Sequence, residues 1–238
     1  MNKLIFLDTE STGNEPLKDR LVQVCYKVDG VVRTEYFKPP ILMSVKAMSV
    51  THITNKMLVD KPPFEGSLMQ NDLQELLKEE VLVAHNALFD IAMLKADGVS
   101  VHKFIDTLRV ARYLDPDNKI PEYNLQFLRY FLELEIEGSA HDAEGDVLVL
   151  EGIFKRLFAK IRESEESDED TIDKMVEISG RPTLFKYMIF GKHKGKTMEE
   201  VLKTDRRYLE WLLSTKLENE EGEEDWIYTL RHYLEKTA

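Results

Sequence analysis

Three short stretches of this sequence carry acidic side chains at spacings that could perform chemistry. The first is Asp8-Thr9-Glu10, which follows the apolar run 4–7. Successive side chains of a strand point to opposite faces, so Asp8 and Glu10 should emerge on the same side. Two like charges in a partly desolvated site repel each other, and a divalent cation would remove that cost. The alternative is a pair of solvated carboxylates at a strand end.

The other two stretches place further carboxylates at the beginnings of helices. Asp90 follows the buried run 81–84 and lies one turn into the helix expected after it. Asp146 lies in the first turns of a long helix that is expected to extend through about Arg162. The sequence therefore offers four carboxylates, each at a strand end or a helix start.

These residue types indicate phosphoryl chemistry assisted by metal ions. Oxygen-only ligands suit Mg²⁺ or Mn²⁺ rather than zinc. Two such ions about 3.5–4 Å apart can activate a water and stabilise the leaving oxygen of an in-line displacement. The reaction also needs a base, and His141, five residues before Asp146, is suitable because an imidazole titrates near pH ~6.5. The ligands predicted for the two ions are Asp8, Glu10, Asp90 and Asp146.

The elements that must position these residues form an α/β pattern. Leu21–Val28 and Val31–Phe37 are apolar, β-branched runs joined by Asp29-Gly30, which is typical of a hairpin. With the run 4–7 they predict three consecutive antiparallel strands. Strand–helix alternation follows and indicates parallel strands with helices on both faces of a mixed sheet. The expected strands are 81–84 and 101–105, and the expected helical or mixed segments are 44–60, 64–79, 86–98, 107–114, 125–134 and 139–162.

Composition divides the chain into a catalytic domain over 1–162, an acidic linker or helix over 163–178, and a small α+β module over 179–238. The last should contain a strand at 187–190 followed by three helices: a short one at 198–202, a second around 208–213 and a last one through Tyr233. The net charge is −12, and the segment 162–177 alone contributes half of this excess. Carboxylates around bound cations do not act as negative charge in the working state, so the acidic total does not exclude a nucleic-acid partner.

The sequence also indicates a compartment. No apolar run approaches the roughly 20 residues that a membrane span needs. Asp8 ends the N-terminal apolar run too early for a signal peptide. Cys25 is the single cysteine, so a buried structural thiol is favoured over a catalytic one. We therefore expect a cytoplasmic protein without a membrane partner.

Taken together, the three motifs resemble those of the DEDD 3′→5′ exonucleases, which have a ribonuclease H-like fold. They are Asp8-Thr9-Glu10, His85-Asn86-x-x-Phe89-Asp90 and His141-x-Ala143-x-x-Asp146, and they agree with the family in order and rough spacing over residues 3–160. A histidine five residues before the last aspartate matches the histidine subclass, which includes exonuclease X-like proteins. The resemblance implies that Asp8, Glu10, Asp90 and Asp146 bind metal and that His141 is the general base.

Other residues are candidates for the substrate side of the site. The segment 48–54 resembles one that lies beside the bound 3′ end in exonuclease X-like and proofreading relatives, so His52 is either a substrate contact or a structural residue. Phe89 is either core or a wall of the terminal-nucleotide pocket. Ser11 stands where many relatives have Thr. The remaining substrate-side candidates are Thr9, Thr12 and Asn86, although Thr9 should face into the structure and Asn86 suits a helix cap.

Residues 191–197, GKHKGKT, form a basic turn that is similar to a phosphate-binding loop but has three residues between its glycines instead of four. We therefore reject a nucleotide site. Eight Lys and Arg residues against three acidic ones lie between Arg181 and Arg207, with aromatic residues among them. This indicates either phosphate-backbone contacts or a solvated basic hairpin. The segment resembles the C-terminal module of some exonuclease X-like proteins, and the candidate phosphate contacts are Lys192, Lys194 and Lys196.

The function predicted is hydrolysis of DNA from a free 3′ end, with release of 5′-mononucleotides by a two-metal mechanism with a histidine base. The same chemistry on RNA is the first alternative, because no residue identified here recognises a 2′-hydroxyl. A non-catalytic nucleic-acid-binding protein on the same fold is the second. The preference for single or double strands, the oligomeric state, and a role in repair, proofreading or turnover stay open.

Overall fold

A five-stranded mixed sheet in the order β3-β2-β1-β4-β5 organises the N-terminal part of the chain. The computed structural model describes residues 3–136, 143–218 and 222–235. Asp29 and Gly30 adopt positive φ values of 50° and 80°, which suit the tight turn between two strands. The first three strands are antiparallel and the last two run parallel to the first, as the sequence predicts. The strands are β1 (Leu4–Ser11), β2 (Leu21–Val28), β3 (Val31–Tyr36), β4 (Val81–Ala84) and β5 (Lys103–Asp106).

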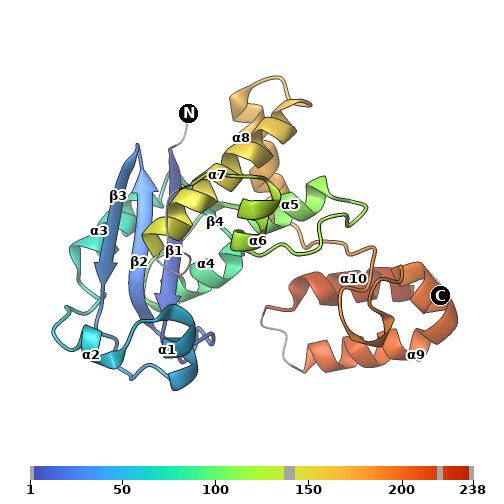
Figure 1. The fold of residues 1–238 in the computed structure, drawn as a ribbon, viewed down its shortest axis with the longest axis horizontal. Coiled ribbons are helices and arrows are strands. Elements are labelled where there is room, and N and C mark those ends of the chain that lie inside the picture. Colours follow the sequence, from blue (N-terminus) through green and yellow to red (C-terminus); the bar gives the residue numbers. More distant parts are fainter. Residues whose placement is uncertain (1–2, 137–142, 219–221, 236–238) are drawn as a thin grey trace. The chain divides into compact units, whose positions relative to one another are not determined.

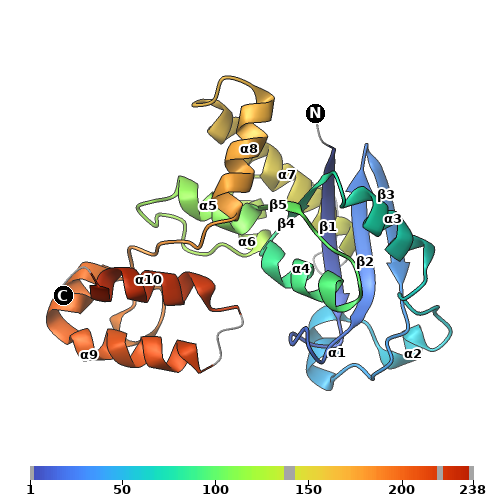
Figure 2. The same ribbon diagram turned by 180° about the vertical axis from the view of Figure 1, so that it is seen from behind.

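Helices cover both faces of this sheet. The long helix α7 (Ala143–Arg162) packs on β1, β2 and β3, and α4 (Ala87–Ala96) packs on β1, β4 and β5. Figures 1 and 2 show α7 on one face, and α4 with α3 (Leu68–Leu76) on the other. The remaining helices of this part are α1 (Val45–Thr51), α2 (Asn55–Leu58), α5 (Thr107–Leu114), α6 (Leu125–Phe131) and α8 (Asp168–Ser179).

The alternation of β1 distributes its side chains between these two layers. Ile5 and Leu7 enter the core that includes Leu73 of α3 and Leu94 of α4. Phe6 faces the other layer, where its ring meets Phe154 of α7 edge to face with 5.3 Å between the ring centroids. Burying these large side chains sets which face of β1 each following residue occupies.

The acidic segment is part of this first unit rather than a linker. Helix α8 contacts β5 and α7 and buries its apolar face, including Ile172, Met175 and Ile178. Three of its acidic residues, Asp168, Glu169 and Asp170, occupy the first turn, where carboxylates interact favourably with the helix dipole. The chain divides into two compact units, one containing residues 1–110 and 122–179 and the other containing 111–121 and 180–238.

The second unit is built on two helices, α9 (Met198–Leu217) and α10 (Glu224–Glu235). The strand expected at 187–190 is wrong in extent: Tyr187 pairs with Thr197 in a single bridge, and a short 3₁₀ turn η1 (Gly191–His193) follows. The positive φ of Gly191, 71°, and of Gly195, 85°, turns the chain before a ladder can form. The core side chains come from both helices and the preceding segment: Phe185, Met188, Met198, Val201, Leu209, Leu212, Trp226 and Leu230.

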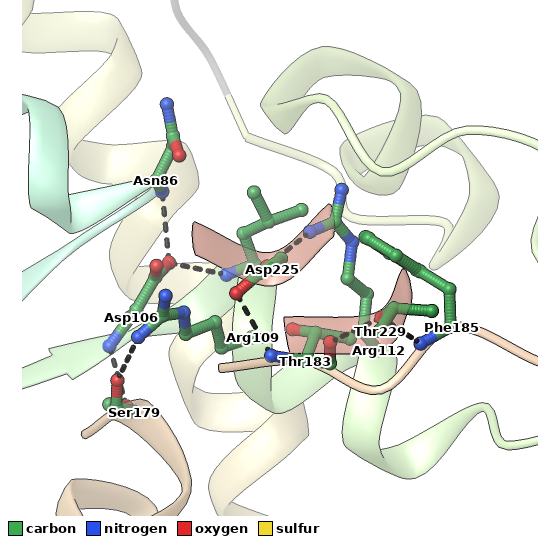
Figure 3. Close-up of polar contacts among 10 residues, drawn as sticks. Asn86, Asp106, Arg109, Arg112, Ser179, Thr183, Phe185, Asp225 and Thr229 are labelled. Carbon is green, nitrogen blue, oxygen red and sulfur yellow. Dashed lines mark hydrogen bonds and ion pairs between the residues drawn. The ribbon is translucent and has the colours of Figure 1, made fainter. Parts of the chain in front are cut away.

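Side chains of α10 form hydrogen bonds with residues 183–185, which precede the core helices of this unit. The carboxylate of Asp225 accepts a hydrogen bond from the Thr183 backbone N–H at 2.9 Å and pairs with Arg112 at 3.1 Å. The Thr229 hydroxyl accepts from the Phe185 N–H at 3.0 Å and donates to the Thr183 carbonyl at 3.1 Å (Figure 3). These bonds satisfy backbone groups that no strand partner satisfies.

None of the helices that the structure describes has the length and apolar character needed to cross a membrane.

Candidate active site

The strand β1 presents Asp8 and Glu10 on the face that also carries Phe6, toward α7. In the ladder with β2, Asp8 stands opposite Cys25 and Glu10 opposite Gln23. The register then shifts between Glu10 and Ser11, so the strand pairing becomes irregular directly after the second carboxylate.

The first turns of α7 supply a third carboxylate. Asp146 is 8% exposed, and its Oδ1 accepts a hydrogen bond from the Gln126 amide of α6 at 2.6 Å. This bond fixes the direction of one Asp146 oxygen. Gln126 is not predictable from the sequence, because a glutamine in an amphipathic helix carries no spacing signal toward a carboxylate twenty residues later.

The fourth carboxylate comes from the opposite layer. Asp90 on α4 is 5% exposed, and its Oδ1 accepts a hydrogen bond from the buried Thr9 hydroxyl at 2.6 Å. Thr9 therefore faces inward, opposite to Asp8 and Glu10, as the alternation of β1 predicts. Its hydroxyl orients Asp90.

The charges of these four carboxylates act on one another. Burial raises the pKa of Asp8 well above its usual value, and repulsion from Asp90, Glu10 and Asp146 raises it further. Burial and the charge of Asp146 raise the pKa of Glu10 to about 7. Burial raises the pKa of Asp90 to about 7 against the opposing effect of the Thr9 hydrogen bond. Such shifts mark a site where like charges are held together at an energetic cost.

The donor set has the chemistry of a hard-cation site, because it consists of carboxylate oxygens whose mutual repulsion a divalent ion would relieve. Among the described residues, no three carboxylate, imidazole or thiolate groups stand close enough in this structure to ligate one ion. The carboxylates would therefore have to draw together around a bound cation. His141, the predicted base, lies outside the described residues.

The start of α4 is held by a residue that the sequence analysis did not single out. Asn86 occupies the predicted N-cap position of α4 in the left-handed conformation, with φ 62°, but its side chain makes no cap bond. Asp106 Oδ1 instead accepts from the backbone N–H groups of Asn86 at 2.9 Å and Leu108 at 3.0 Å. Figure 3 shows Asp106 between Asn86 and Ser179, whose hydroxyl accepts from the Asp106 N–H at 2.8 Å.

His85 supports the same junction. Its Nδ1 lies 2.9 Å from the Thr107 hydroxyl, and its Nε2 lies 2.7 Å from the Tyr123 carbonyl oxygen. Both ring nitrogens are therefore engaged, in agreement with a structural role. An Asp at the end of one strand, one residue before a helix, is the signal that could have identified Asp106 as a cap.

The other substrate-side candidates lie in different surroundings. The Thr12 hydroxyl is buried and donates to Asp19 at 2.7 Å, and the Ser11 hydroxyl bonds to the Gly13 carbonyl. Phe89 is half-buried and packs against the core. His52 is exposed and ends α1 in the left-handed conformation with φ 58°.

The three lysines proposed as phosphate contacts lie in the second unit. Lys192, Lys194 and Lys196 are all exposed, and Lys192 forms an ion pair with Asp205 at 2.7 Å.

Comparison with known proteins identifies relatives over both units. The family model described as Exonuclease matches residues 5–154, and the model described as Exodeoxyribonuclease X-like C-terminal matches residues 188–214. Exodeoxyribonuclease 10 of Escherichia coli is 29% identical over a 241-residue alignment that covers 98% of this chain and all of that protein. The DNA polymerase III epsilon subunit of Treponema pallidum is 32% identical over 164 residues, which are 64% of this chain and 74% of that protein.

Solved structures agree on the fold. Exonuclease X in complex with 5′-overhanging duplex DNA matches with a TM-score of 0.57 and 22% identity, over 74% of this chain and 99% of the other. An E. coli exonuclease I complex with a dA16 oligonucleotide matches with a TM-score of 0.53 and 22% identity, over 68% of this chain and 43% of the other. The sheet and its flanking helices are therefore those of a ribonuclease H-like exonuclease fold.

Proposed function

Since this chain belongs to the exonuclease family whose model matches residues 5–154, we propose that it hydrolyses DNA from a free 3′ end in a reaction that needs divalent metal ions. The observation that carries this proposal is that Asp8 is repelled by Glu10 of the same strand and by Asp90 and Asp146, which lie on two helices at opposite faces of the sheet. A silent relative would be expected to lose at least one of these groups.

The four carboxylates would hold Mg²⁺ or Mn²⁺, and bound ions would supply charge stabilisation at the reacting phosphate and a more acidic water. Thr9 and Gln126 limit the rotation of Asp90 and Asp146 by the hydrogen bonds described above. Asp106 holds the backbone from which α4 starts and so positions Asp90. His141 would accept the proton of the attacking water.

DNA is favoured over RNA as the substrate. Exodeoxyribonuclease 10 aligns with nearly the whole chain, and the C-terminal unit matches a model named after the same kind of enzyme. The 3′→5′ direction and the release of 5′-mononucleotides rest on the resemblance of the motifs to the histidine subclass.

The test is digestion of DNA and RNA strands of equal sequence, labelled at either the 3′ or the 5′ end, with Mg²⁺, Mn²⁺ or a chelator. We expect the 3′ label to appear first as a mononucleotide, while the 5′ label moves through a ladder of shortening strands. Asp90→Asn should lower the rate by at least about 10²-fold, because even an outer-shell group of a metal site is worth 10–100-fold. Asp60→Asn, the same change at an exposed carboxylate, should leave the rate unchanged.

The role of His141 as the base can be tested separately, through the dependence of the rate on pH. With His141 as base, the rate should rise with pH as the imidazole loses its proton near pH ~6.5, and His141→Gln should lower the rate and remove this limb. His102→Gln, at an exposed histidine, is the matched control. Mononucleotide release that persists in chelator would exclude the metal mechanism, and a preference for RNA would overturn the substrate alone.

A further inference from the structure

One face of the C-terminal unit combines an exposed tryptophan with cations. Trp211 is 57% exposed, although large apolar side chains are usually withdrawn from water. Its ring lies 5.6 Å from the ring of Tyr208, and Lys192 Nζ lies 4.8 Å from the centroid of the same tyrosine. We call the surface formed by Lys192, Lys194, Arg207, Tyr208 and Trp211 the Trp211 face.

A carboxylate at a break in α9 links this helix to the basic turn 191–197. Asp205 has non-helical φ and ψ of −153° and 57° inside the helix. Its carboxylate accepts hydrogen bonds from Lys192 Nζ at 2.7 Å and His193 Nε2 at 2.9 Å. One side chain therefore holds the basic turn against the second half of α9, with Tyr208 between them.

Gly191 permits the close approach of this turn to Tyr208. It has a positive φ of 71°, and a Cβ atom at this position would lie 2.4 Å from the Tyr208 hydroxyl oxygen. The backbone of the turn therefore lies directly against the Tyr208 side chain, with Lys192 over its ring.

Two cations of this face are available to a ligand. Lys194 and Arg207 are exposed, and among the described residues no carboxylate forms an ion pair with either side chain. Arg207 and Trp211 are four residues apart on α9 and therefore share one side of the helix. Lys192, in contrast, is neutralised by Asp205.

We propose that the Trp211 face binds a single-stranded segment of nucleic acid, with a base stacked on Trp211 and phosphates at Lys194 and Arg207. Aromatic rings beside cations bind every base because each base has a flat face, and a duplex hides those faces between its pairs. The lysine and arginine supply the charge that a phosphate backbone requires. The inference rests on the proposed function, because the bound strand would be the exonuclease's own substrate.

The test measures binding of a labelled single-stranded DNA oligonucleotide to the full chain in chelator, so that no hydrolysis occurs, over a series of salt concentrations. Trp211→Ala should weaken binding by at least about fivefold at every salt concentration, the lower end of the value of one stacked base. Trp211→Phe should retain most of the affinity. Lys194→Ala and Arg207→Ala should each reduce the slope of log affinity against log salt by about 0.7.

A matched control exists on the neighbouring helix. The double variant Tyr228→Ala/Arg231→Ala removes one exposed aromatic and one exposed cation from α10, and it should bind like the unaltered chain. If Trp211→Ala/Arg207→Ala also binds like the unaltered chain, the Trp211 face does not bind nucleic acid and the proposal is overturned. Equal losses in both double variants would overturn it too, because they would indicate general charge alone.

Hydrolysis of a dinucleotide with Mg²⁺ separates this inference from the proposed function. A dinucleotide is long enough only to occupy the catalytic carboxylates, so the variants of the Trp211 face should hydrolyse it at the unaltered rate. If the unaltered chain cannot hydrolyse either this substrate or longer DNA, the proposed function fails, and the binding series still decides the role of the face.

Discussion

At the scale of single residues, the alternation of side chains along β1 directs the polar residues at the end of this strand to opposite layers of the fold. Asp8 and Glu10 share the face that meets α7 and Asp146, while Thr9 faces the layer of α4 and donates to Asp90. One three-residue stretch therefore reaches both layers of the fold. The consequence is that carboxylates from opposite sides of the sheet repel one another at the strand end.

This repulsion predicts how stability depends on pH without metal. The pKa of Glu10 rises from 4.5 to about 7 on folding, so between these pH values the folded state keeps a proton that the unfolded state releases. In chelator, the free energy of unfolding should therefore fall as the pH rises from about 4.5 to 7, by about 1.4 kcal/mol for each unit of pKa shift.

Urea unfolding at several pH values checks this expectation. Glu10→Gln cannot ionise, so it should reduce the fall and be more stable than the unaltered chain above pH ~7. Glu35→Gln, at an exposed position of β3, serves as the control. If the free energy of unfolding changed with pH in the same way for the unaltered chain and Glu10→Gln, the pKa of Glu10 would not be raised in the folded state.

At the scale of elements, the site depends on the junctions where strands end and helices begin. Asp106 connects two of them, since one carboxylate oxygen accepts from the N-cap residue of α4, Asn86, and from the second residue of α5, Leu108. His85 adds bonds to Thr107 and Tyr123 at the same place. Asp90 lies one turn after this junction, so its position follows from bonds that it does not make itself.

We expect Asp106→Ala to lower the free energy of unfolding by about 1 kcal/mol, because it leaves two partly buried N–H groups without their acceptor. It should also raise the Mg²⁺ concentration needed for half-maximal nuclease activity, since the start of α4 is no longer held. Asp106→Asn retains an acceptor oxygen and should show a smaller effect in both measurements. Equal effects of the two variants would mean that charge, rather than the two hydrogen bonds, is what matters at this position.

At the scale of the whole molecule, α8 ends the first unit, and the second unit consists of the residues after it together with residues 111–121. This helix buries Ile172, Met175 and Ile178 against the first unit, although its sequence is strongly acidic. The Asp106 N–H and the Arg109 side chain also bond to Ser179, its last residue. Removal of α8 would expose apolar surface of α7 and leave these polar groups unsatisfied.

A fragment ending at Ser179 should therefore unfold cooperatively on heating, whereas a fragment ending at Arg162 should have a lower midpoint or aggregate. Thermal unfolding followed by circular dichroism distinguishes the two. Equal midpoints would show that α8 is dispensable for the first unit.

The sequence alone was sufficient for the features that depend on local chemistry. The Asp29-Gly30 turn, the alternation of β1 and the apolar periodicity of α7 predicted the meander and the placement of Asp8, Glu10 and Asp146, because turn type and side-chain direction depend on neighbours in the chain. The three motifs together indicated the family that the comparisons then showed.

Only the tertiary structure decided which groups support the carboxylates. The bonds from Thr9 to Asp90 and from Gln126 to Asp146 join residues 81 and 20 positions apart, and such partners leave no periodic signal in a sequence. The same reason explains why the acidic segment is a packed helix and why residues 187–190 form a bridge rather than a strand: burial against distant elements outweighs local propensity. The carboxylates at the end of β1 could be predicted from the sequence, whereas the residues that hydrogen-bond to the carboxylates of the site could be identified only from the fold.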